Sequence, residues 1–163
     1  MTSFLRHGPL TEALVAPGAT PDHVQLLLQS YLVGLEITTE LVIVDPYFFA
    51  RLDPGYAQYV KEILQPILGS LRNLTIVYSP HRVNPLAVSG IKNELSSSAS
   101  HVNLIHRQSK VFHDRFWMNP ISGKGFITGC SLNGLGRKYA LVDRLESSDA
   151  AKVLAALRRE QLL

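Results

Sequence analysis

The segment Val111–Lys138, with the sequence VFHDRFWMNPISGKGFITGCSLNGLGRK, decides how the rest of the chain is interpreted. We predict two strands, joined by a turn at residues 123–125 and followed by a glycine-rich loop. Because side chains at i and i+2 share one face of a strand, His113 and Arg115 should lie side by side. A guanidinium holds phosphate through forked hydrogen bonds, and an imidazole beside it can attack phosphorus or move a proton. The segment therefore predicts a phosphate site.

The composition indicates a single globular domain over residues 1–163, of which 1–19 are poorly defined apart from a short helix expected near Leu10–Val15. The chain has 46% hydrophobic and 18% charged residues. No apolar run approaches the roughly 18 residues of a membrane span, and no signal-peptide pattern is present, so we expect no membrane partner. The single cysteine, Cys130, excludes an internal disulfide and fits a cytoplasmic protein.

The positive charge is concentrated around the same segment. The formal net charge is +3, and residues 106–144 hold seven Lys or Arg against two Asp, which leaves −2 for the rest. An anionic partner such as a nucleic-acid backbone would explain this excess. A solvated surface explains it equally well.

Hydrophobic periodicity predicts helices that alternate with strands. Thr20-Pro21 and Asn84-Pro85 have the pattern of an N-cap followed by proline at the first helical position. Helices are expected from Pro21 to Leu35, from Asp53 to Leu71, from Asn84 to Leu95 and from Ser148, and strands over Leu41–Val44, Leu74–Tyr78, Val102–His106, Val111–Met118, Gly125–Thr128 and Tyr139–Val142. This order predicts an α/β fold with a mixed β-sheet flanked by helices on both faces.

Two strand ends carry polar residues that could face a ligand. Asp45 follows the strand Leu41–Val44, where an acid can face a ligand crevice or cap the turn that Pro46 begins; we favour the turn. His81 and Arg82 follow Leu74–Tyr78 and could approach a phosphate, although simple exposure is the preferred interpretation.

The motifs of the central segment resemble those of the phospholipase D superfamily. His113-Asp114-Arg115, followed by Gly129-Cys130-Ser131-Leu132-Asn133, is similar to the family pattern H-x-K-x4-D followed by G-S-x-x-N. The resemblance implies a phospholipase-D-like fold and a phosphodiesterase that needs neither metal nor cofactor.

The resemblance also assigns roles to individual residues. His113 would be the nucleophile or the acid, Arg115 would hold phosphate oxygens in place of the family lysine, and Asn133 would donate a further hydrogen bond. Ser131, with Arg137 and Lys138 of the glycine-rich loop, would add phosphate contacts. Active members use two motifs, so a chain with one motif would form a homodimer with the two His113 side chains at a shared site.

Two departures from the family pattern put activity in question. Pro120 occupies the position of the family acid, which orients an imidazole, and strand alternation points Asp114 to the opposite face from His113. Cys130 replaces the family serine, and it is expected to be a small packed residue.

Two functional hypotheses therefore stand. The first is a homodimeric phosphodiesterase acting on nucleic acid, in which Val111 and Trp117 would join the interface beside His113. The second is a catalytically inactive module that binds nucleic acid, or a protein partner within a larger complex. The chain's own loops could equally cover Trp117.

Overall fold

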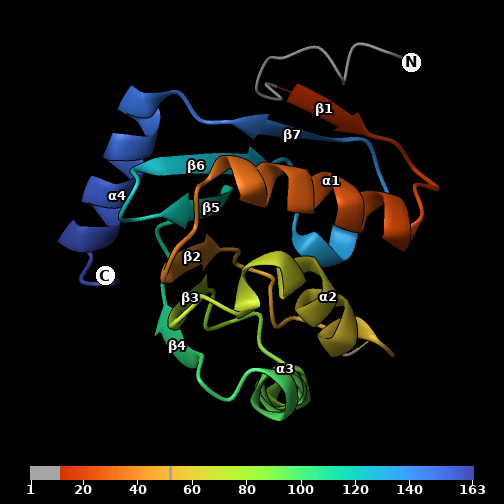
Figure 1. The fold of residues 1–163 in the computed structure, drawn as a ribbon. Coiled ribbons are helices and arrows are strands. Elements are labelled where there is room, and N and C mark those ends of the chain that lie inside the picture. Colours follow the sequence, from red (N-terminus) through yellow and green to blue (C-terminus); the bar gives the residue numbers. More distant parts are fainter. Residues whose placement is uncertain (1–11, 52) are drawn as a thin grey trace.

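The computed structural model describes residues 12–51 and 53–163, which form one seven-stranded sheet with helices on both sides (Figure 1). The strands are β1 (Glu12–Val15), β2 (Glu40–Val44), β3 (Asn73–Tyr78), β4 (Asn103–Gln108), β5 (Arg115–Asn119), β6 (Lys124–Thr128) and β7 (Ala140–Arg144). The helices are α1 (Pro21–Gly34), α2 (Tyr56–Leu68), α3 (Pro85–Ser98), α4 (Ser147–Arg159) and the short 3-10 helix η2 (Leu132–Gly134). Within the described part of the chain, no helix combines the length and apolar character needed to cross a membrane.

The sheet is mixed, as predicted. Its strand order is β1-β7-β6-β5-β2-β3-β4. Strands β2, β3 and β4 run parallel, whereas β5, β6, β7 and β1 pair antiparallel with their neighbours. The carboxyl ends of β2, β3 and β4 therefore meet the amino end of β5 at one edge of the sheet.

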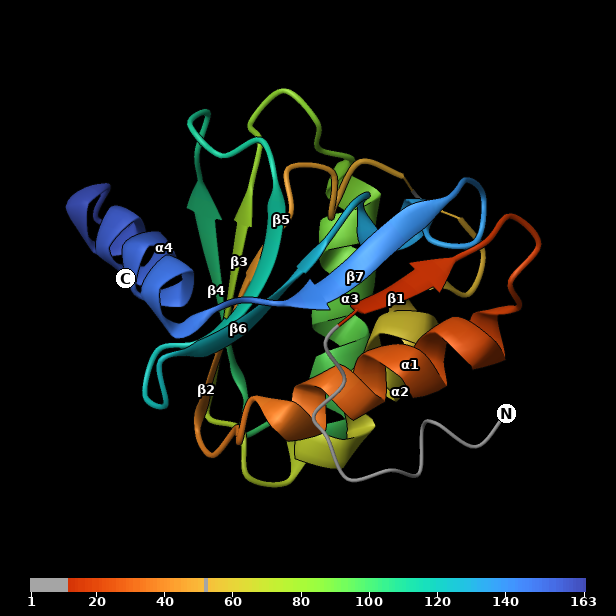
Figure 2. The ribbon, with the colours of Figure 1, turned by 90° about the horizontal axis from the view of Figure 1, so that it is seen from above.

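Helices cover the two faces unequally (Figure 2). On one face, α1, α2 and α3 pack over inward side chains such as Leu41, Ile43 and Trp117. Trp117 is 1% exposed and stacks on Phe126 with ring centroids 5.4 Å apart. On the other face, α4 packs over a smaller cluster that includes Met118. The predicted α/β class with helices on both faces is confirmed.

The helix starts follow the local sequence signals. Thr20 accepts a hydrogen bond on its hydroxyl from the His23 amide at 3.2 Å, and the Asn84 side chain accepts one from the Leu86 amide at 3.0 Å. Both N-cap predictions are confirmed, because a side-chain oxygen satisfies an amide that the first helical turn leaves without a partner.

Two predicted elements near the chain's start and centre were wrong. Residues 12–15 form strand β1 instead of a helix, because they pair with β7 and place Val15 opposite Ala140. Residues 1–11 of the predicted N-terminal segment lie outside the described residues. The strand expected over Val111–Met118 begins only at Arg115. Its neighbour β2 ends at Val44, opposite Phe116, and residues before Phe116 have no β2 residue to pair with.

Candidate functional site

The loops that leave the parallel strands converge at the edge described above. The Asp45 amide donates to the Val77 carbonyl at 2.9 Å, and the Ser79 amide donates to the Pro46 carbonyl at 3.1 Å. The Ser109 amide in turn donates to the Tyr78 carbonyl at 2.9 Å. These bonds extend the strand ladder by a residue and hold the three loops side by side. Ligands of open α/β sheets bind outside such carboxyl ends.

A cavity of about 270 Å³ lies between these loops and the approach to β5. Four basic side chains and two serine hydroxyls contribute to its wall, and none of the described residues that line it is Asp or Glu. The lining comprises Pro46, Tyr47, Ser79, His81, Ser109, Lys110, Phe112, His113 and Arg115. The cavity is therefore electropositive and suited to an anion.

The Tyr47 ring supports two guanidinium groups. The guanidinium carbons of Arg82 and Arg115 each lie 5.4 Å from the centroid of this ring. Two cations share one aromatic side chain because the ring attracts each of them through its quadrupole. The turn that carries this ring is held by Asp45, whose carboxylate accepts a hydrogen bond from the Tyr47 backbone amide at 3.0 Å. The turn-capping role predicted for Asp45 is thus confirmed.

Not every hydrogen-bond donor of the Arg115 guanidinium has a partner among the described residues. Its Nη1 donates to the His113 carbonyl at 3.2 Å. Its Nε is buried and has no hydrogen-bond partner among residues 12–51 and 53–163. A buried donor without an acceptor costs free energy, so an anion that enters the cavity and draws on this guanidinium would relieve that cost.

His113 lies at the rim of the cavity, in the loop before β5. Its side chain is 94% exposed, and its Nδ1 lies 3.1 Å from an oxygen of Asp114. The prediction that Asp114 faces away from His113 is wrong, because these two residues precede the strand and do not follow its alternation. Pro120 lies past the far end of β5, where the neighbouring Asn119 donates to the Leu35 carbonyl at 2.9 Å.

A buried carboxylate joins the loop after β6, which carries the second half of the motif, to the end of β2. Asp45 is 1% exposed, and each of its oxygens lies 2.7 Å from the Ser131 hydroxyl, which donates to it. The Leu132 amide donates to the same carboxylate at 3.0 Å, and Asn133 Nδ2 donates to the Tyr47 carbonyl at 3.0 Å. Burial raises the pKa of Asp45, and these donors oppose that rise. Ser131 and Asn133 thus fix the loop that carries Tyr47.

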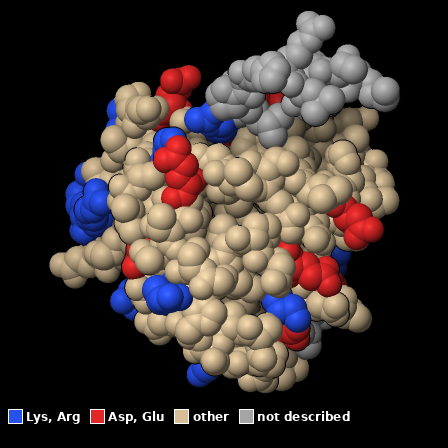
Figure 3. Space-filling view, viewed as in Figure 1, with Lys and Arg blue, Asp and Glu red and all other residues tan. Residues whose placement is uncertain are grey.

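The remaining predicted phosphate ligands lie elsewhere. Arg137 is exposed and forms an ion pair with Asp53 at 3.3 Å, and Lys138 is exposed on the same loop. Lys124 pairs with Glu36 at 2.6 Å, at the opposite end of β5 from Arg115. The basic segment 106–144 therefore does not form one surface. Figure 3 likewise shows Lys and Arg interspersed with Asp and Glu on the face that carries α1 and α2.

The architecture has counterparts among solved structures. The chain is similar to polyphosphate kinase from Porphyromonas gingivalis, with a TM-score of 0.55, 11% identity, and coverage of 97% of this chain and 28% of that one. The fold is phospholipase-D-like. The fold expected from the motif resemblance is confirmed.

Other comparisons gave weaker likenesses or none. TrmBL2, an archaeal chromatin protein whose structure shows DNA binding, has a TM-score of 0.47 at 12% identity over 99% of this chain and 54% of that one. A yeast tyrosyl-DNA phosphodiesterase mutant has a TM-score of 0.43 at 12% identity over 82% and 32% of the two chains. This chain thus spans between 28% and 54% of the length of the three proteins. No family model matches the chain, and no curated protein does.

Proposed function

We propose that this chain is a phospholipase-D-like module that binds nucleic acid by holding a backbone phosphate in the cavity at the carboxyl ends of β2, β3 and β4. The observation that carries the proposal is the pair of guanidinium groups, Arg82 and Arg115, on the ring of Tyr47. A guanidinium presents two parallel donors to phosphate oxygens, and its charge is permanent. Lys110 adds a third positive charge beside the same cavity, and His81 and His113 line it as well.

Binding without cleavage agrees best with how the motif residues are used. The Ser131 hydroxyl is committed to Asp45, and Asn133 Nδ2 is committed to the Tyr47 carbonyl. His113 is almost fully exposed, whereas a nucleophilic imidazole needs a fixed orientation toward phosphorus. The motif therefore supports a site wall more directly than a reaction centre.

The test is the salt dependence of nucleic-acid affinity. Fluorescence anisotropy would follow labelled single-stranded and duplex DNA and RNA between 50 and 200 mM salt, roughly the range over which phosphate contacts change affinity strongly. The Arg82→Gln/Arg115→Gln protein should bind more weakly, and its log–log slope should fall by about one unit, because the two guanidinium groups neutralise one phosphate. Arg72→Gln removes one charge at the opposite end of β3 and serves as the matched control for the single substitution Arg115→Gln. Equal reductions in Arg115→Gln and Arg72→Gln would rule the site out.

A second candidate function is a metal-independent phosphodiesterase that works as a homodimer. The contact between Asp114 and His113 Nδ1 favours it, because it would leave Nε2 free to attack phosphorus. One His113 would form the phosphorus–nitrogen bond while the second protonates the leaving oxygen, and water would then cleave the intermediate. Trp117 adds no support for the dimer, since it is buried in the chain's own core.

Nuclease assays with and without EDTA, together with light scattering, test this candidate. Activity should survive EDTA, disappear in His113→Ala and fall strongly in Asp114→Asn, and the protein should be a dimer. A monomer without activity would leave the binding function alone.

A further inference from the structure

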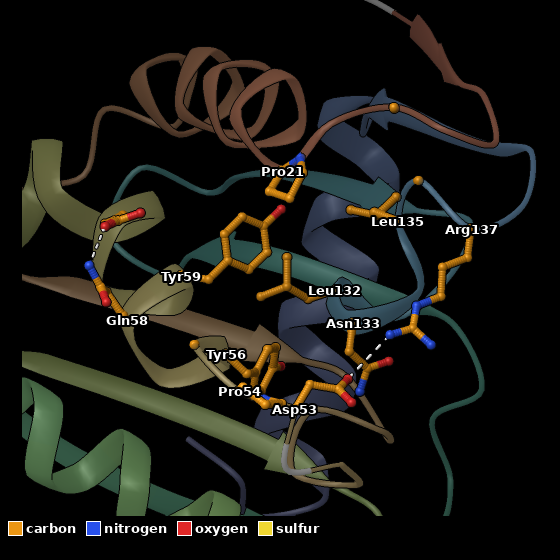
Figure 4. Close-up of a pocket in the computed structure, with 14 residues that line it drawn as sticks. Pro21, Asp53, Pro54, Tyr56, Gln58, Tyr59, Leu132, Asn133, Leu135 and Arg137 are labelled. Atoms are coloured by element: carbon orange, nitrogen blue, oxygen red, sulfur yellow. Dashed lines mark hydrogen bonds and ion pairs between the residues drawn. The ribbon is translucent and has the colours of Figure 1, made fainter.

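A second, larger cavity lies on the other side of the Asn133–Tyr47 contact. Its volume is about 510 Å³, and it opens between the start of α1, the first turns of α2 and the loop around η2 (Figure 4). Its size falls within the range of small-molecule sites, roughly 300–1,000 Å³. The function proposed above makes no use of it.

The chemistry of this second cavity differs from that of the first. Apolar side chains of Pro21, Leu132 and Leu135 surround Tyr59 in its middle (Figure 4). Charged groups remain at the edges, where Asp53 pairs with Arg137. The cavity therefore combines an apolar, aromatic interior with polar groups at its rim.

Tyr59 presents its hydroxyl group to this cavity. Burial raises the pKa of its hydroxyl to about 12. No described residue accepts or donates a hydrogen bond at this hydroxyl, which points past Leu132 toward Pro21 in Figure 4. The hydroxyl is therefore available to a ligand, whose polar edge would take the place of solvent as its hydrogen-bond partner.

We propose that this cavity receives a nucleobase from the same strand whose phosphate is held beside Arg115, an inference that rests on the proposed function. The two cavities share a wall, because Tyr47 lines the first and Asn133, which bonds to its carbonyl at 3.0 Å, lines the second. A strand that crosses this wall places a phosphate on one side and a base on the other. The ligand class is thus single-stranded nucleic acid with an unstacked base.

The charges favour a base over a second phosphate. Glu62 contributes a carboxylate to the second cavity, and the one arginine among its described lining residues, Arg137, is paired with Asp53, so the lining has no excess of positive charge to hold a phosphate. A nucleobase is uncharged and flat, and its edge carries donors and acceptors that the rim groups and the Tyr59 hydroxyl can meet. An apolar peptide side chain would fill the interior and leave that hydroxyl without a partner.

The experiment compares two labelled single-stranded oligonucleotides of equal length, one with intact bases and one with an abasic sugar at every position. Both carry the same phosphates, so the first cavity treats them alike. The intact strand should bind on the order of 5- to 100-fold more tightly in anisotropy titrations, the effect of one base–aromatic stack. Tyr59→Ala should remove most of that preference, whereas Tyr59→Phe should keep the stacking part. Tyr139→Ala, at a 71% exposed tyrosine outside the cavity lining, is the matched control.

A titration with adenosine, which has no phosphate, separates the two proposals. We expect amide resonances around Tyr59 and Leu135 to shift in two-dimensional NMR spectra, and those around Lys110 to stay in place. If the intact and abasic strands bind equally and adenosine shifts no amide resonance, the base site is overturned and phosphate binding still stands. A cavity that takes a peptide side chain would give the same result. Failure of both strands to bind would remove the proposed function, and the adenosine titration would then decide on the cavity alone. Thermal unfolding of each variant separates a defect in binding from a defect in folding.

Discussion

Replacing Ser131 by alanine tests whether the buried Asp45 carboxylate holds the site loops together. In the folded protein this carboxylate receives the Ser131 hydroxyl at 2.7 Å, the Leu132 amide at 3.0 Å and the Tyr47 amide at 3.0 Å. The substitution removes the side-chain donor and leaves the two amides. A hydrogen bond to a charged group contributes roughly 1.5–3 kcal/mol, so we expect Ser131→Ala to lower the free energy of unfolding by about 2 kcal/mol.

Urea unfolding measures this destabilisation. With a slope of roughly 2 kcal/mol per molar urea, the midpoint should fall by about 1 M while the slope stays unchanged. Ser96→Ala is the matched control, because Ser96 is exposed on α3. In an Asp45→Asn background the Ser131→Ala effect should shrink, since the charged acceptor is gone. A destabilisation equal to that of Ser96→Ala would refute the claim that this contact stabilises the loops.

The same destabilisation should depend on pH. The Ser131 hydroxyl lowers the pKa of Asp45 against the larger opposing effect of burial. The stability that the Ser131 hydroxyl contributes is therefore full when Asp45 is charged, and it declines as the pH falls through the pKa of Asp45 in the folded protein. The difference between wild type and Ser131→Ala should be larger at pH 8 than at acidic pH. A pH-independent difference would show that the hydroxyl acts on something other than the carboxylate.

Three further outcomes are expected. Trp117→Ala should cost about 3–5 kcal/mol in urea unfolding, because the ring is fully buried against Phe126; a cost below roughly 1 kcal/mol would contradict its place in the core. Burial raises the pKa of Asp45 above its ordinary value of 3.8, so the protonated carboxyl is favoured by folding: the stability that this preference contributes is full below pH 3.8 and is lost as the pH rises through the folded pKa. Asp45→Asn should flatten that part of the pH–stability curve, and an unchanged curve would refute the assignment. Neutralising Arg137 and Lys138 together should weaken nucleic-acid binding and reduce its salt slope by roughly one unit for each phosphate that the protein no longer neutralises; an unchanged slope would identify them as solvated surface.

The sequence predicted elements whose signals are local. The N-caps at Thr20 and Asn84, the apolar runs of β2 and β3 and the hairpin between β5 and β6 each depend on neighbouring residues, and the structure contains all of them. The turn of that hairpin was placed wrongly at residues 123–125; it lies at residues 120–123, because Lys124 and Gly125 already pair with β5. The mixed sheet followed from the order of these elements. The start of β5 was missed because it depends on where β2 ends, which is information from a distant part of the chain.

The sequence predicted only part of the site, for the same reason. Arg115 was expected to hold phosphate, and it does line the basic cavity. Asp45 and Ser131 are 86 residues apart, and no local pattern indicates that the hydroxyl meets the carboxylate. Arg82 follows β3 and reaches Tyr47 after β2, so the shared ring becomes visible only once the parallel pairing of these strands is known. The one available signal was the presence of polar residues after consecutive predicted strands.

The central claim is that the cavity beside Arg115 binds a backbone phosphate, and NMR of the arginine side chains tests it most directly. Arg115 Nε is buried without a protein partner among the described residues, so its Nε–H resonance should respond strongly to a new acceptor at the guanidinium. Titration with a dinucleotide, which contains one phosphodiester, should shift this resonance in a saturable way and leave that of Arg72 unchanged, with the shift weakening as salt is added. An Arg115 resonance that stays in place, or that moves no more than that of Arg72, would contradict phosphate binding at this site.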